Sequence, residues 1–147
     1  HMARYFELDE KRTKVLRKLV KRHPKQFGHI DPEHVVAIVD KDSDRARAYA
    51  DCSLVPLRIT PLTPYQIVIT IYECNYRRMD RNAKILCLFH ELLHVAEGPS
   101  GYKLRRHDLE DFKALVEVFG PNWPQRKDLP NFLKEDTRVT LKLESMD

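Results

Sequence analysis

The distribution of apolar residues along the first half of the chain predicts one helix followed by several strands. Apolar side chains recur at helical spacing between residues 9 and 23, and Pro24 ends that segment. Residues 34–40 are rich in valine and isoleucine and predict a buried strand, and residues 46–59 are expected to be mainly strand. Residues 65–72 have β-branched and aromatic side chains at a period of two, so they predict the clearest strand in the chain.

The second half of the chain predicts two helices. Residues 80–97 have apolar side chains at helical spacing, with Asp80 as the expected N-cap and Gly98 as the stop signal. A further helix is expected over residues 107–119, where the inward positions are again apolar. One helix, then strands, then two helices is the order typical of an α+β fold with a small mixed sheet, rather than of alternating β-α-β units.

The remaining segments complete a chain that we expect to form one domain over residues 3–147. Residues 121–132 are rich in proline and predict an ordered segment anchored by Trp123. The tail, residues 134–147, alternates near its end and predicts a short strand or a docked segment. His1-Met2 is interpreted as a cloning remnant.

The composition, 42% hydrophobic and 33% charged, is typical of a soluble globular protein. The sequence has no apolar run that could cross a bilayer and no signal-peptide pattern, so a cytoplasmic protein without membrane association is expected. Cys52, Cys74 and Cys87 lack paired spacing, which argues against a disulfide framework or a cysteine-type zinc site. Cys87 precedes His90 by one helical turn and could approach a metal there, but a buried inert thiol is the favoured interpretation.

Positive charge is concentrated near the start of the chain. Residues 10–25 contain eight lysines and arginines against one acidic residue, a net charge of +7 that leaves −3 for the rest of the chain's total of +4. This asymmetry permits an anionic partner, and nucleic acid is the candidate for residues 11–25. The favoured interpretation is simpler, because the same segment has an apolar stripe and the basic residues can be its solvated face.

The strongest chemical signal is the sequence His-Glu-Leu-Leu-His at residues 90–94. A helix turns by about 100° per residue, so His90 and His94 diverge by only about 40° and can reach one metal ion. Glu91 lies beside them, where its carboxylate can act as a general base towards a water molecule. A catalytic zinc ion takes three protein ligands and water, so the motif predicts a zinc site that needs a third ligand. Two ordinary surface histidines are the alternative, but the apolar neighbours predict a buried helix, where unpartnered histidines are unfavourable.

The third ligand is left open by the motif itself. His107 is the leading candidate, because the glycine-containing turn after the motif helix lets the next helix return over the metal. Glu97 ranks second as a residue one turn beyond the motif, while Glu110 and Asp111 are expected to face solvent or cap the helix. Asp108 is a candidate to hydrogen-bond a metal-ligating imidazole, or it can serve as a helix N-cap.

The stretch from Ile85 to Phe112 resembles the phage-type metallopeptidase family. The recurrent features of that family are an H-E-L-L-H helix and a downstream H-D-x-E-D-F segment, which stand here at residues 90–94 and 107–112. The resemblance spans roughly residues 30–133. It implies a zincin-like fold, one divalent metal ion, expected to be zinc, and peptidase activity, and it favours His107 as the third ligand.

Peptide-bond hydrolysis is therefore the expected reaction, with a protein or peptide as substrate and Glu91 as the general base. Tyr102, Arg105 and Arg106 are candidates to stabilise the oxyanion, although each can equally be a surface residue. The strand at residues 65–72 could pair with an extended substrate, or it can be an ordinary sheet strand.

Two alternatives belong to other functional classes. The first is a nucleic-acid-associated zincin, either a DNA-repair-type protease or a DNA-binding protein, that uses the basic helix at its start. The second is a metal-binding module without turnover, which Glu91 disfavours because a purely structural site needs no general base. The sequence predicts no oligomeric state.

Overall fold

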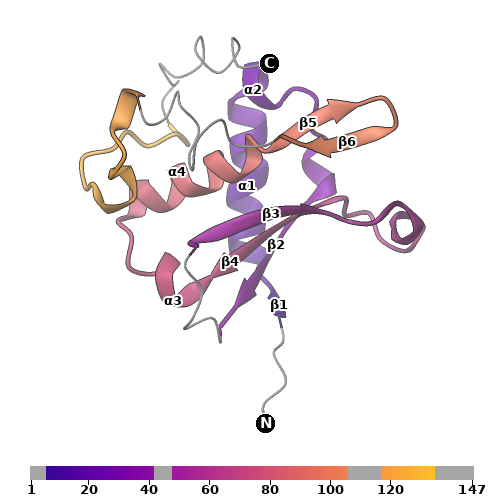
Figure 1. The fold of residues 1–147 in the computed structure, drawn as a ribbon, viewed down its shortest axis with the longest axis horizontal. Coiled ribbons are helices and arrows are strands. Elements are labelled where there is room, and N and C mark those ends of the chain that lie inside the picture. The colour runs from indigo at the N-terminus through magenta and orange to yellow at the C-terminus, as the bar shows by residue number, and fades with distance from the viewer. Residues whose placement is uncertain (1–5, 42–47, 106–116, 135–147) are drawn as a thin grey trace.

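A four-stranded mixed sheet forms the centre of the computed structural model, which describes residues 6–41, 48–105 and 117–134 (Figure 1). Its strands lie in the order β1-β2-β4-β3, where β2 and β4 are parallel and the two outer strands are antiparallel to their neighbours. The strands are β1 (Phe6–Leu8), β2 (Val35–Asp40), β3 (Ala50–Leu54) and β4 (Ile67–Tyr72). A separate hairpin is formed by β5 (Val95–Gly98) and β6 (Gly101–Leu104).

Two long helices cover one face of this sheet. The α-helices are α1 (Glu10–Arg22), α2 (Pro24–Phe27), α3 (Glu73–Tyr76) and α4 (Arg81–Leu92), and the 3₁₀ segments are η1 (Pro32–His34), η2 (Leu57–Leu62) and η3 (Trp123–Gln125). Because α1 contacts β2, α4 contacts β3 and β4, and the two helices contact each other, they lie on the same face. The β5–β6 hairpin extends away from the end of α4 (Figure 1).

The first helix begins and docks through side chains that the sequence supplies locally. The Asp9 carboxylate accepts a hydrogen bond from the backbone N–H of Arg12 at 3.0 Å, which caps the helix. The Thr13 hydroxyl accepts a hydrogen bond from the backbone N–H of Ala37 and so ties α1 to β2. Leu16 and Leu19 are fully buried, and burying each side chain stabilises the fold by about 1.5–3 kcal/mol.

The central position of β2 and β4 in the sheet explains why their sequences are nearly continuous apolar runs. Both β2 and β4 are paired on each side, and most of their side chains are buried. Apolar residues on both faces are typical of parallel strands inside a sheet. Since β4 lies between β2 and β3, it has no free edge, and the expectation that it could pair with a substrate is wrong.

The helix predicted over residues 80–97 begins as expected but ends earlier. Asp80 caps α4, which stops at Leu92, and Val95–Gly98 form a strand instead. This strand pairs with β6, in which Gly101 has a φ of +128° that other residues rarely adopt. Apolar spacing alone allowed the helix to continue, whereas pairing with a later segment ends it.

Other predictions have mixed outcomes. The α+β prediction is confirmed, and the arrangement is compatible with a zincin-like fold. Within residues 46–59, only Ala50–Leu54 are strand among the described positions, and 3₁₀ segment η2 begins at Leu57. Of the helix expected over residues 107–119, the structure describes only 117–119, which are helical. The tail beyond Lys134 lies outside the described residues.

Candidate metal centre

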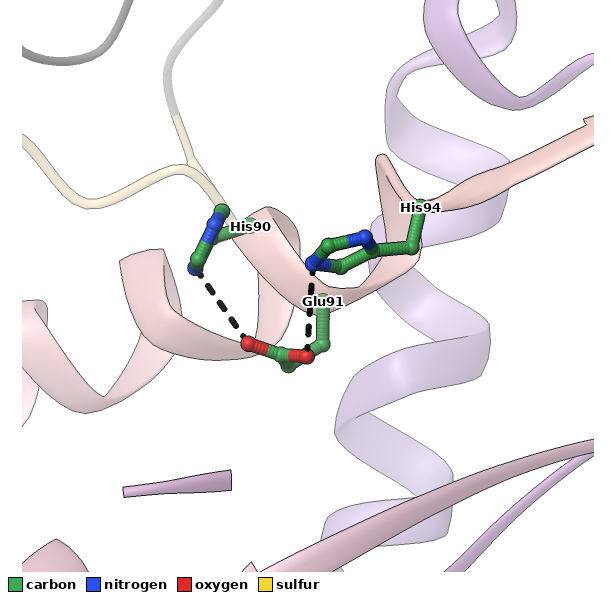
Figure 2. Close-up of side chains that lie close together, drawn as sticks. All are labelled: His90, Glu91 and His94. Carbon is green, nitrogen blue, oxygen red and sulfur yellow. Dashed lines mark ion pairs between the residues drawn. The ribbon is translucent and has the colours of Figure 1, made fainter. Parts of the chain in front are cut away.

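His90, Glu91 and His94 bring three possible metal-ligating atoms together at the end of α4. One such atom of each residue lies within 4.8 Å of the other two, and no second group of this kind is found in the described part of the chain. Figure 2 shows both imidazoles facing the Glu91 carboxylate. His90 Nδ1 lies 3.3 Å from Glu91 Oε2, and His94 Nε2 lies 3.8 Å from Glu91 Oε1.

His90 and Glu91 are buried and His94 is half-buried, and this burial bears on the chemistry of the group. The exposed fraction is 8% for His90 and 5% for Glu91. A carboxylate removed from water is unfavourable unless cations or hydrogen-bond donors face it. The two imidazoles lie where they, or a metal ion that they hold, can supply that compensation.

His90 is positioned by the packing of α4. Every residue of the helix from Ile85 to Leu92 is buried, so the orientation of the helix is set by the core. The ring of Trp123 lies edge-on to the His90 ring, with 6.0 Å between their centroids. Trp123 is itself only 2% exposed, which confirms the predicted anchoring of residues 121–132.

His94 is positioned by a different contact, since it lies beyond the last helical residue. Its Nδ1 is 2.8 Å from the backbone oxygen of Arg105. A carbonyl oxygen only accepts hydrogen bonds, so Nδ1 carries a proton, and in the neutral ring Nε2 then has its lone pair towards the centre of the group. Metal-ligating histidines usually make such a bond through their other ring nitrogen, which fixes the tautomer and the ring orientation.

The hairpin that supplies this carbonyl is held at several points. The backbone N–H of Arg105 donates to the carbonyl of His94 at 2.5 Å, and His29 Nε2 lies 2.7 Å from the carbonyl oxygen of Val95. The Tyr102 hydroxyl lies 2.7 Å from His34 Nδ1 and accepts a hydrogen bond from the backbone N–H of Asp31. These contacts fasten the hairpin to the segment between α2 and β2.

The remaining predicted site residues fall into two groups. Tyr102 directs its hydroxyl to His34, and burial raises its pKa, so the phenol stays protonated at neutral pH. Glu97 is exposed on β5, which removes the premise that it lies one helical turn beyond His94. The others lie outside the described residues: Arg106, His107, Asp108, Glu110 and Asp111.

Two features near the site were not predicted from the sequence. The first is the Arg105 carbonyl, which performs for His94 the role that the sequence suggested for Asp108. No side-chain pattern could reveal it, because every residue has a carbonyl. The second is Cys52 on β3, whose thiol has a pKa raised by burial and further by the charge of Glu91. Cys52, Cys74 and Cys87 form no disulfide within the described part of the chain, and Cys87 is buried.

The fold and the site together define a class, an α+β protein with a buried His-Glu-His group suited to a metal ion. The chain belongs to the family described as "Putative phage metallopeptidase", whose model matches residues 4–135. The matched range contains residues 90–94 and 107–112.

Two further comparisons gave no match, since neither a curated protein nor a solved structure is significantly similar to the chain. Within the described residues, every helix is too short or too polar to span a membrane.

Proposed function

We propose that this chain is a zinc-dependent peptidase in which His90, His94 and His107 hold the metal and Glu91 is the general base. The observation that carries the proposal is the convergence of His90, Glu91 and His94, of which His90 and Glu91 are buried. Membership of the metallopeptidase family supports the same reaction class.

The residues present fit a zinc ion in their chemistry. Imidazole nitrogen is a preferred zinc donor, and catalytic zinc sites commonly combine histidine ligands with one position left open. The proton on His94 Nδ1 leaves the other ring nitrogen available for a metal ion.

Bound zinc would lower the pKa of a water molecule and polarise the scissile carbonyl. The Glu91 carboxylate would take the proton from that water and then deliver it to the leaving amine. Its location between the two imidazoles keeps it within reach of any group that they bind. Its burial also limits competition from bulk water.

The hairpin supports His107 as the third ligand. It returns the chain to the site, because both backbone groups of Arg105 are hydrogen-bonded to His94. Two residues span at most about 7 Å, so a side chain two positions beyond Arg105 can approach the same metal, which supports His107. Glu97 is the alternative ligand, and its exposure on β5 weighs against it. Because Tyr102 is bonded to His34, Arg105 and Arg106 are the stronger oxyanion candidates.

The test compares wild-type protein with Glu91→Gln, both loaded with zinc, on a mixture of denatured proteins. We expect both to hold about one zinc per chain, while the variant loses activity by roughly 10²–10⁴-fold. A wild-type protein that cannot be loaded would contradict the proposal. If both bind zinc and neither cleaves, the chain is a metal-binding module without turnover.

A second pair of variants identifies the third ligand. We expect His107→Ala to weaken zinc binding strongly and Glu97→Ala to leave it unchanged, as measured by competition with a chelator. The reverse result would assign the ligand to Glu97.

A further inference from the structure

Five exposed lysines form a row along α1 and into α2, and we call them the lysine ridge: Lys11, Lys14, Lys18, Lys21 and Lys25. Within α1 they are separated by three or four residues, so they share one side of the helix. That side is opposite the buried stripe of Leu16 and Leu19. The ridge extends about 15 Å along the helix from Lys11 to Lys21. Because it lies opposite the buried stripe, it is the outermost surface of α1.

The arginines and the lysines of this segment have different surroundings. Arg12 forms ion pairs with Asp9 and Glu73, and Arg17 forms one with Glu33. In contrast, no ion pair joins a ridge lysine to any residue that the structure describes. Neighbouring like charges on a helix repel one another. An ordinary solvated face would relieve that repulsion with interspersed acidic residues, and only Glu10 is available in residues 10–25.

Positive charge continues from the end of the ridge onto the β5–β6 hairpin. A pocket of about 650 Å³ between α2 and the hairpin is lined by Lys25, Lys103 and Arg105, with Glu97 as its acidic residue. Three cationic side chains around one concave surface attract anionic oxygens such as those of phosphate.

We propose that the lysine ridge and this pocket bind the phosphate backbone of B-form duplex DNA without reading its sequence. The lysine ammonium is a point charge that suits phosphate contacts, whereas base recognition relies on planar groups such as arginine and asparagine. The ridge on α1 shares no residue with the His90–His94 group, whereas the pocket includes Arg105, whose carbonyl lies within hydrogen-bond distance of His94. Glu91 lies outside both, so it should not contribute to DNA binding. Such binding would hold a peptidase close to proteins that are bound to DNA.

The composition of the ridge argues against other anionic partners. A membrane surface requires an apolar helix face, and that of α1 is buried in the core. Single-stranded nucleic acid requires aromatic stacking residues, and α1 has none. Protein interfaces are depleted in lysine. The major groove of B-form DNA admits a helix, whereas that of A-form RNA is too narrow for side chains.

The experiment measures binding of the full chain to a DNA duplex of roughly 20 base pairs, about two helical turns, as a function of salt. With four to five phosphate contacts, log K should fall with log salt at a slope of about −3.6 to −4.5. Affinity should therefore drop by about 150- to 500-fold between roughly 50 and 200 mM salt. Glu91→Gln should bind as wild type does, which separates this result from any failure of the peptidase proposal.

Two quadruple variants with matched charge locate the surface. The ridge variant combines Lys11→Gln, Lys14→Gln, Lys18→Gln and Lys21→Gln, and the control combines Arg58→Gln, Arg77→Gln, Arg81→Gln and Lys127→Gln at exposed positions elsewhere. Each quadruple variant lowers the formal net charge from +4 to 0. We expect the ridge variant to bind DNA at least tenfold more weakly than wild type, with a slope of log K against log salt that is shallower by about 3. The control should bind as wild type does.

Three outcomes would overturn the proposal. They are a wild-type slope near zero, a control variant that loses as much affinity as the ridge variant, and tighter binding to single-stranded DNA or duplex RNA than to duplex DNA. Thermal melts of both variants check that they are folded, and a Lys→Arg version of the ridge, which keeps its charge, should retain binding.

Discussion

The two histidines of the motif are held by different kinds of structure. His90 lies on α4, where the side chains around it are buried and the ring of Trp123 lies against it. His94 lies beyond the end of α4, and its ring is oriented by the carbonyl of Arg105, eleven residues later in the chain. One histidine is therefore positioned by core packing and the other by hydrogen bonds to a hairpin.

This difference predicts unequal local stability. Most side chains of α4 are buried, so the helix can unfold only if the core opens, whereas most side chains of β6 are exposed. Exposed hairpins with few buried contacts open more easily than core helices. Changes to the core should therefore act on the stability of the whole fold, while changes to the hairpin should act mainly on metal binding.

The largest effect is expected from Phe89→Ala on the buried side of α4. Phe89 is fully buried, and its ring packs against those of Phe27 and Phe132, with distances between ring centroids of 5.1 and 4.8 Å. The cavity should lower the free energy of unfolding by about 3–5 kcal/mol, measured by urea denaturation. The control is Phe6→Ala, at a position that is 48% exposed, and it should change stability by less than about 1 kcal/mol. Equal losses in the two variants would contradict this picture of the core.

Gly101→Ala should have the next largest effect, and it should act on the hairpin. The φ of +128° at Gly101 is strained for any residue with a side chain, at about 1–3 kcal/mol. We expect faster amide exchange in β5 and β6 and weaker zinc binding, with α4 unchanged. Gly120→Ala, also at positive φ but remote from the hairpin, is the control. Unaltered hairpin exchange in Gly101→Ala would refute the assigned turn.

A smaller effect is expected from Tyr102→Phe, which removes one hydroxyl from the hairpin anchor. The lost hydrogen bond to His34 should cost about 0.5–1.5 kcal/mol, so zinc affinity should fall by less than about tenfold. Tyr65→Phe provides a matched control, and a cobalt spectrum of each variant reports the ligand geometry directly. A spectrum and affinity equal to wild type would show that the anchor does not position His94.

The smallest effect concerns pH and the thiol of Cys52. Burial and the charge of Glu91 raise the pKa of this thiol above its ordinary value of 9.0. The folded protein then holds the proton more tightly than the unfolded chain does, so this contribution is present below pH 9 and is lost as pH rises above it. Wild type should therefore lose stability between about pH 8 and 10 more steeply than Cys52→Ala. Parallel curves would contradict the burial of this thiol.

The sequence predicted what depends on local periodicity and missed what depends on distant contacts. The patterns of α1, β2 and β4 are repeated over several residues, and those elements are where they were predicted. The predicted end of α4 was wrong, because Val95–Gly98 continue the apolar spacing of the helix but pair with β6 as a strand. The motif predicted that His90, Glu91 and His94 would meet. The carbonyl that orients His94 has no side-chain signal and required the fold.

The central claim is that His90 and His94 hold one metal ion together although different structures position them. Its most direct test is zinc titration of wild type, His90→Ala and His94→Ala at neutral pH against a chromophoric chelator, with circular dichroism to confirm folding. We expect one tightly bound zinc per wild-type chain and a loss of at least about a hundredfold in affinity for each variant. Folded variants that bind zinc as wild type does, or a wild-type chain that binds none, would contradict it.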